Sequence, residues 1–143
     1  MTPVQRDEQL VHRHLAALDG ALAQVRRHAG RPLAVLSADL DERWAVERGL
    51  QVCAQNCIDI ATHLATSAGH SLTDYASAID ALVPLGILDP AFAARFRAVA
   101  GFGNLLVHGY LDVDLARLHL LLNERLEDFA QFATRIRGSL NDA

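Results

Sequence analysis

The chain has 143 residues, of which 51% are hydrophobic and 21% are charged, and its net charge is −4 at pH 7. This length suits one domain with a sizeable core, and the low charge content excludes a disordered chain. A protein that is acidic as a whole repels polyanions, so any contact with nucleic acid must use a local cluster of arginine. No apolar run is long enough to span a membrane, and the N-terminal residues lack a signal-peptide pattern. We therefore expect a soluble, cytoplasmic protein.

Apolar residues recur at three- and four-residue spacing along nearly the whole chain, and alternating β-branched runs are almost absent, which predicts an all-α fold. A first helix is predicted over about residues 4–28, ended by the Gly30-Arg31-Pro32 segment. Residues 33–40 are expected to form a short helical or turn segment. A second helix then covers about residues 42–68, with Asp39 or Asp41 as its cap.

A third helix is predicted over about residues 74–83, with Ser71 or Thr73 as its cap and Pro84 beyond its end. Asp89-Pro90 is a cap followed by proline at the first helical position, and it begins a fourth helix that reaches Val107 or Tyr110. A turn at residues 112–114 precedes a fifth helix to about residue 137. Because no repeat or linker interrupts the pattern, residues 1–143 are expected to form one antiparallel bundle of four or five helices.

Metal and cofactor chemistry finds little support in the sequence. No two histidines lie at a helical ligand spacing, and there is no phosphate-binding loop, so neither a metal nor a cofactor is expected. Cys53 and Cys57 lie four residues apart in one helix, where a disulfide is poorly placed, and both are expected to be reduced core residues. Surface or packing roles are expected for the remaining histidines, which are His12, His14, His28, His63, His70 and His119.

A ridge of polar residues winds slowly round the second predicted helix, because its members recur every four residues. It consists of Glu47, Gln51, Gln55, Asp59 and His63. The ridge is either a solvated face, or a surface that faces the His108 segment or a partner subunit.

The segment Gly101-Phe102-Gly103-Asn104-Leu105-Leu106-Val107-His108-Gly109-Tyr110 places polar residues in a strongly apolar helical stretch. On a helix, Asn104 and His108 share one edge, while position 103 and Tyr110 stack on the adjacent edge. A lone histidine here would more often be a packed, hydrogen-bonded residue. With Asn104 and Tyr110 at this spacing, a functional site is favoured instead.

This segment resembles the active-site motif of HepT-like toxins, a branch of the HEPN ribonuclease superfamily. That motif reads Arg-Asn, three further residues, His, any residue, Tyr, and Asn104, His108 and Tyr110 match it. Gly103 stands where the family has arginine. Further segments that look like the family are Glu47-Arg48 with Gln51, residues 57–61, Tyr75, residues 85–88 and residues 112–114, so that the resemblance covers about residues 40–120. It implies a HEPN-like helical bundle.

The resemblance also implies a function, namely a toxin of a type II or type VII toxin-antitoxin system that cleaves RNA without a metal. The family implies a homodimer whose shared cleft contains His108, the acid or base of cleavage, and an arginine that holds the scissile phosphate. Gly103 has no side chain to hold the scissile phosphate or to offset the charge that develops on it, so activity of this chain is expected to be impaired. Arg95 and Arg97 lie one or two turns earlier and are conceivable replacements.

For the other site residues the sequence allows two interpretations. Asn104 either orients His108 and contacts substrate, or joins two helices. Tyr110 is implied as the residue to which a nucleotidyltransferase antitoxin adds adenylyl groups, although an aromatic that seals the helix end would look the same. Glu47 and Asp59 either support the cleft or form structural ion pairs. The alternative to a ribonuclease is a non-catalytic, dimeric helical binding module that interacts with a nucleotidyltransferase-like antitoxin.

Overall fold

The computed structural model describes the backbone of residues 3–108 and 114–141, and the side chains of residues 8–102 and 114–141. Its long helices are α1 (Pro3–Arg26), α3 (Leu40–Ser67), α5 (Pro90–His108) and α7 (Leu126–Asn141). The short helices α2 (Leu33–Ala38), α4 (Tyr75–Ala81) and α6 (Leu115–Leu120) lie between them in the chain. No strand occurs in these ranges, so the predicted all-α bundle is confirmed.

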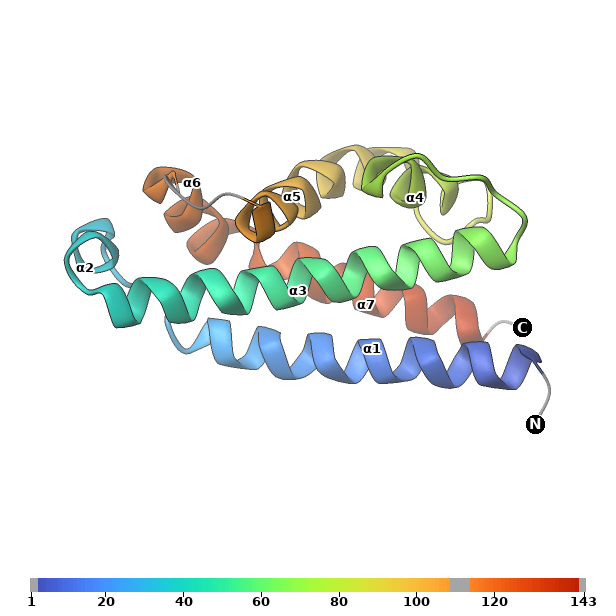
Figure 1. Ribbon diagram of the computed structural model, residues 1–143, viewed down its shortest axis with the longest axis horizontal. Coiled ribbons are helices and arrows are strands. Elements are labelled where there is room, and N and C mark those ends of the chain that lie inside the picture. The colour runs from blue at the N-terminus through green and yellow to red at the C-terminus, as the bar shows by residue number, and fades with distance from the viewer. Residues whose placement is uncertain (1–2, 109–113, 142–143) are drawn as a thin grey trace.

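The long helices pack side by side in alternating directions (Figure 1). α1 and α3 form the most extensive contact, α7 packs against both, and α5 lies across α3 with α4 beside it. α5 runs opposite to α3, so that its C-terminal end lies over the N-terminal half of α3 (Figure 1). The helical part of the motif segment, residues 101–108, is thereby placed over the N-terminal half of α3.

Aspartate side chains cap the starts of α3, α4 and α6. Asp39 accepts a hydrogen bond from the Glu42 amide, as predicted, and Asp114 caps α6 in the same way. The predicted Ser71 or Thr73 cap of α4 is wrong. Asp74 holds that position and forms a reciprocal capping box with Ser77, because its carboxylate reaches the Ser77 amide while the Ser77 hydroxyl reaches back.

The C-terminal helix differs from the prediction, which gave one regular helix over residues 115–137. α6 passes into a π-helical turn at Leu121–Arg125 before α7 begins, and α7 continues to Asn141. A π turn holds one more residue than an α turn. Three leucines from successive turns are all buried around it, namely Leu121, Leu122 and Leu126.

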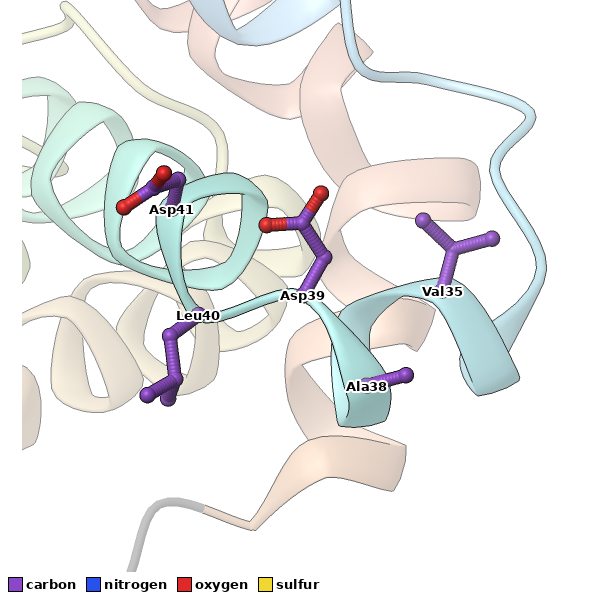
Figure 2. Close-up of a pocket in the computed structure, with 5 residues that line it drawn as sticks. All are labelled: Val35, Ala38, Asp39, Leu40 and Asp41. Atoms are coloured by element: carbon purple, nitrogen blue, oxygen red, sulfur yellow. The ribbon is translucent and has the colours of Figure 1, made fainter.

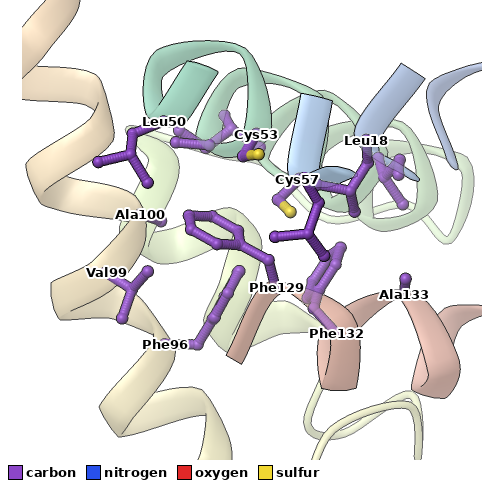
Figure 3. Close-up of a cluster of buried hydrophobic side chains, with 14 of the residues drawn as sticks. Leu18, Leu50, Cys53, Cys57, Phe96, Val99, Ala100, Phe129, Phe132 and Ala133 are labelled. Carbon is purple, nitrogen blue, oxygen red and sulfur yellow. The ribbon is translucent and has the colours of Figure 1, made fainter. Parts of the chain in front are cut away.

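Aromatic rings from α5 and α7 fill the centre of the core (Figure 3). Phe96 stacks on Phe92 and on Phe132 with ring centroids 5.4 Å and 4.8 Å apart, and meets the edge of Phe129 at 5.9 Å. All four rings are buried. Such ring pairs add stabilisation beyond the area that they bury, so Phe96 anchors α5 to α7.

The predicted core cysteines are confirmed as buried, free thiols. Burial raises the pKa of Cys53 to about 12, although Arg26 lowers it. Burial also raises the pKa of Cys57 well above its ordinary value. Because the thiolate is the reactive form, neither group is a candidate nucleophile.

Gly49 sets the spacing of α1 and α3, and its replacement gives a clear prediction. A Cβ at this position would lie 2.2 Å from Cγ2 of Val25, which is buried. Gly49→Ala should therefore destabilise the protein by about 1–3 kcal/mol, even though alanine favours the helix. Chemical denaturation measures the change in the free energy of unfolding.

Gly20→Ala in α1 is the matched control, since no atom lies within 4 Å of its Cβ, and it should stabilise by up to about 1 kcal/mol. Equal stability of the two variants would contradict the close approach.

Candidate functional site

The motif lies in the last turns of α5, and the start of that helix is held firmly. Asp89 accepts a hydrogen bond from the Phe92 amide at 2.7 Å and one from Arg135 at 2.6 Å. These two hydrogen bonds lower the pKa of Asp89, with the larger effect from the amide, so its carboxylate is ionised at neutral pH. The helix ends at His108, within the predicted range.

Gly103, Asn104 and His108 belong to the helical part of α5, but their side chains lie outside the described residues, and so does the whole of Tyr110. Their placement therefore rests on the helix itself. Positions 104 and 108 follow Gly101 by three and seven residues, which puts all three within about 60° of one another around the axis. This edge of α5 is the candidate site.

The same edge is bordered by α4. Tyr75, the first residue of α4, brings its hydroxyl against Gly101. Arg97 lies one turn before Gly101 and pairs with Asp80 of α4 at 3.4 Å, where both side chains are about half exposed. An exposed pair of this kind contributes little to stability.

Arg95 does not replace the missing motif arginine. Its guanidinium binds Asp128 at 3.2 Å and Gln131 at 3.2 Å, which places it on the side of α5 that faces α7. Arg97 lies on the edge of positions 104 and 108, and it is the better placed of the two predicted replacements. It is also seven residues, or about 10 Å along the helix, from position 104.

The polar ridge of α3 is neither wholly solvated nor wholly buried. Each four-residue step turns about 40° round the helix, so the ridge rotates from the half-buried Glu47 to the exposed Gln55. Gln55 donates a hydrogen bond to Asp59 at 2.9 Å. The two predicted supporting carboxylates, Glu47 and Asp59, lie about 18 Å apart along α3, and Glu47 is the one near the level of the end of α5.

Glu47 has a perturbed environment. Its carboxylate lies 3.7 Å from Nε of Arg43, and neither Oε1 of Glu47 nor Nε of Arg43 has a hydrogen bond within the described residues although both atoms are buried. Burial raises the pKa of Glu47, and the charge of Arg43 partly opposes this. A raised pKa in a buried carboxyl is typical of functional sites and also of structural ion pairs.

One hollow elsewhere on the surface is acidic and does not suit a polyanion. It has a volume of about 570 Å³ and lies where α2 meets the start of α3 (Figure 2). Asp39 and Asp41 border it, together with Val35, Ala38 and Leu40. Two carboxylates at an open hollow repel phosphate, so this place does not suit RNA.

The histidines within the described residues have structural roles where their contacts are known. His14 bonds Asn56 at 2.8 Å, which joins α1 to α3, and His119 bonds the carbonyl of Arg31 at 3.1 Å. His28 lies 2.5 Å from Glu42. No group of three metal-ligating side chains occurs among residues 8–102 and 114–141.

Residues 18–136 match the family model described as "Ribonuclease HepT-like". The chain belongs to this family. A curated relative, the tRNA nuclease HepT of Aphanizomenon flos-aquae, is 28% identical over 108 residues, covering 72% of this chain and 71% of the relative. The recognised family and the predicted helical fold are thus both confirmed.

Solved structures agree on the fold of this HepT-like chain. A tri-AMPylated HEPN toxin of Shewanella oneidensis in complex with MNT antitoxin superposes with a TM-score of 0.79 at 21% identity, over 90% of this chain and 97% of the toxin. A toxin-antitoxin complex with AMP-PNP gives a TM-score of 0.80 at 20% identity, over 91% and 98% of the two chains. No helix within residues 3–108 and 114–141 has the length and apolar character of a membrane span.

Proposed function

We propose that this HepT-like chain is the toxin of a toxin-antitoxin pair, an RNA endonuclease by descent that a nucleotidyltransferase antitoxin neutralises. The observation that carries the proposal is the motif of Asn104 and His108 in the last turns of α5, with Tyr110 two residues further along the sequence, inside the family match. The relative named a tRNA nuclease and the solved toxin-antitoxin complexes support it. RNA and an ATP-dependent partner both belong to the cytoplasm, where we place the protein.

The chemistry follows from the residue types. Histidine has an unperturbed pKa near 6.5, so His108 can take the proton of a ribose 2′-hydroxyl or return one to the leaving oxygen, without a metal. Asn104, one turn earlier, is suited to orient the imidazole or to bind substrate. Gly103 supplies no guanidinium for the phosphate, and we propose that cleavage is impaired for that reason. Since the relative acts on tRNA, tRNA is the first substrate to test.

The second candidate function is a non-catalytic dimeric module that only binds the antitoxin. Gly103 is the observation that favours it, because the position of the phosphate-binding arginine is empty of a side chain. An RNA cleavage assay separates the two candidates. Cleavage that depends on His108 supports the nuclease, and binding of the antitoxin without cleavage supports the module.

A shared cleft requires a homodimer, and we expect a symmetric one. The chain is 51% hydrophobic, and exposed apolar side chains remain on the described surface, among them Trp44 at 58% and Leu120 at 45% exposure. Light scattering at micromolar concentration should give about twice the mass of 15.6 kDa. A monomeric mass that does not rise with concentration would remove the shared cleft from the account.

Neutralisation of the toxin can proceed by complex formation or by adenylylation, and the second route makes a prediction for Tyr110. Adenylyl groups on this residue, two positions after His108, place negative charge beside the site and repel RNA phosphate. Incubation with the cognate nucleotidyltransferase and ATP, followed by peptide mass spectrometry, should find the modification on Tyr110 and lose it in Tyr110→Phe. Modification on Tyr75 alone, or none at all, would contradict this role.

A further inference from the structure

The contact between Tyr75 and Gly101 has an unusual geometry. A Cβ at position 101 would lie 2.4 Å from the hydroxyl oxygen of Tyr75 and 3.2 Å from its Cζ. The hydroxyl therefore occupies space that any other residue at position 101 would fill. The glycine lets α4 place a phenol directly on the backbone of α5.

The Tyr75 ring is held in place, while its hydroxyl has no hydrogen-bond partner among the described side chains. The ring is half-buried and packs against the core, which fixes its direction. Residues 8–102 and 114–141 form no hydrogen bond with this hydroxyl. A phenol that is held rigidly can donate its hydroxyl proton to a ligand oxygen.

The position of the hydroxyl connects it to the motif. Gly101 shares its edge of α5 with positions 104 and 108, and it precedes His108 by about 10 Å along the axis. Arg97 extends the same edge by one more turn and is about half exposed. A guanidinium, a phenol and the two motif positions thus follow one another along a single edge.

We propose that Tyr75 is a positioning residue for the substrate, whose hydroxyl donates a hydrogen bond to a phosphate oxygen of the RNA strand beside the scissile phosphate. This inference rests on the proposed ribonuclease function. Tyrosine hydroxyls commonly bind backbone phosphates, and such contacts fix the register of a strand without reading its sequence. The ring is packed against the core, so stacking on a base is not its role.

The test compares RNA affinity and stability in Tyr75→Phe, which removes the hydroxyl and keeps the ring. Fluorescence anisotropy with a labelled single-stranded RNA oligonucleotide should show an affinity about tenfold lower than in the unaltered chain, because a charge-assisted hydrogen bond is lost. The melting temperature should stay unchanged, since no group among residues 8–102 and 114–141 loses a partner. Thr134→Val is the matched control: its hydroxyl bonds only the Ala130 carbonyl of its own helix, and RNA affinity should not change.

A second variant tests the geometry. Gly101→Ala must displace the Tyr75 hydroxyl, so it should lower RNA affinity to a similar extent, and the double variant with Tyr75→Phe should bind no more weakly than the weaker single variant. In a chain made active by Gly103→Arg, Tyr75→Phe should raise KM about tenfold with little change in kcat, as expected for a contact made equally before and during reaction.

The possible failures are distinguishable. If the unaltered chain binds RNA and Tyr75→Phe binds it equally well, the role of Tyr75 is wrong and the ribonuclease proposal stands. If affinity and melting temperature fall together, Tyr75 is structural and the inference is overturned. If neither the unaltered chain nor Gly103→Arg binds RNA, the inference and the proposed function both fail.

Discussion

Gly103→Arg should raise the rate of RNA cleavage by a factor on the order of 10² or more, which corresponds to a few kcal/mol of transition-state stabilisation. The new guanidinium would stand beside His108 in the order Arg-Asn, three residues, His that the family motif has. It would hold the scissile phosphate and offset the charge that develops on it. The measurement is the initial rate of cleavage of a labelled tRNA by equal amounts of the two purified proteins.

A matched control separates this effect from a general gain in charge. Gly138→Arg adds the same side chain to α7 at an open position, where no atom lies within 4 Å of a Cβ. It should leave the cleavage rate unchanged. Gly103→Arg should also be toxic in an expression host unless the antitoxin is present, whereas Gly138→Arg should not. Equal gains from both changes would point to non-specific attraction of RNA.

Phe96→Ala should destabilise the protein by about 3–5 kcal/mol, the usual cost of removing a buried aromatic side chain. Phe96 is fully buried and contacts the rings of Phe92, Phe129 and Phe132 from both sides, so its removal leaves a cavity that the helices cannot easily close. Since a domain of this size is stable by only about 5–15 kcal/mol, the loss is a large part of the total.

Urea denaturation at one fixed protein concentration measures this loss, because the stability of a dimer depends on concentration. The control is Thr134→Ala, which removes an exposed side chain of α7 whose hydroxyl donates only to the Ala130 carbonyl, and it should change stability by less than about 1 kcal/mol. A cost below about 1 kcal/mol for Phe96→Ala would contradict the central position of its ring.

Much of the fold could be predicted because local signals marked the helices. Asp39 and Asp89 begin α3 and α5 as expected, since an aspartate cap is a property of a few neighbouring residues. Gly30 adopts a φ of +86° after α1, in agreement with the predicted helix end. The π-helical turn at Leu121–Arg125 was missed, because no proline or glycine marks it and leucine fills both of its flanks.

Less of the site could be predicted from the sequence. Asn104, His108 and Tyr110 were found through their resemblance to a motif, which concerns residues close together in the chain. The contact of Tyr75 with Gly101 joins residues on different helices, so it cannot be predicted from the spacing of residues in the sequence. The ridge on α3 was visible as a pattern, but only the packing of the other helices around α3 determines that Glu47 is half-buried while Gln55 is exposed.

The central claim is that the edge of α5 with His108 is a ribonuclease site that lacks its arginine. The most direct test is the tRNA cleavage rate of Gly103→Arg compared with that of the double variant Gly103→Arg/His108→Ala, both shown to be folded by circular dichroism. The account predicts cleavage by the single variant and a loss of that gain, by a factor on the order of 10² or more, in the double variant. A folded Gly103→Arg protein that leaves tRNA and other RNA intact, or a double variant that cleaves as fast as the single one, would contradict it.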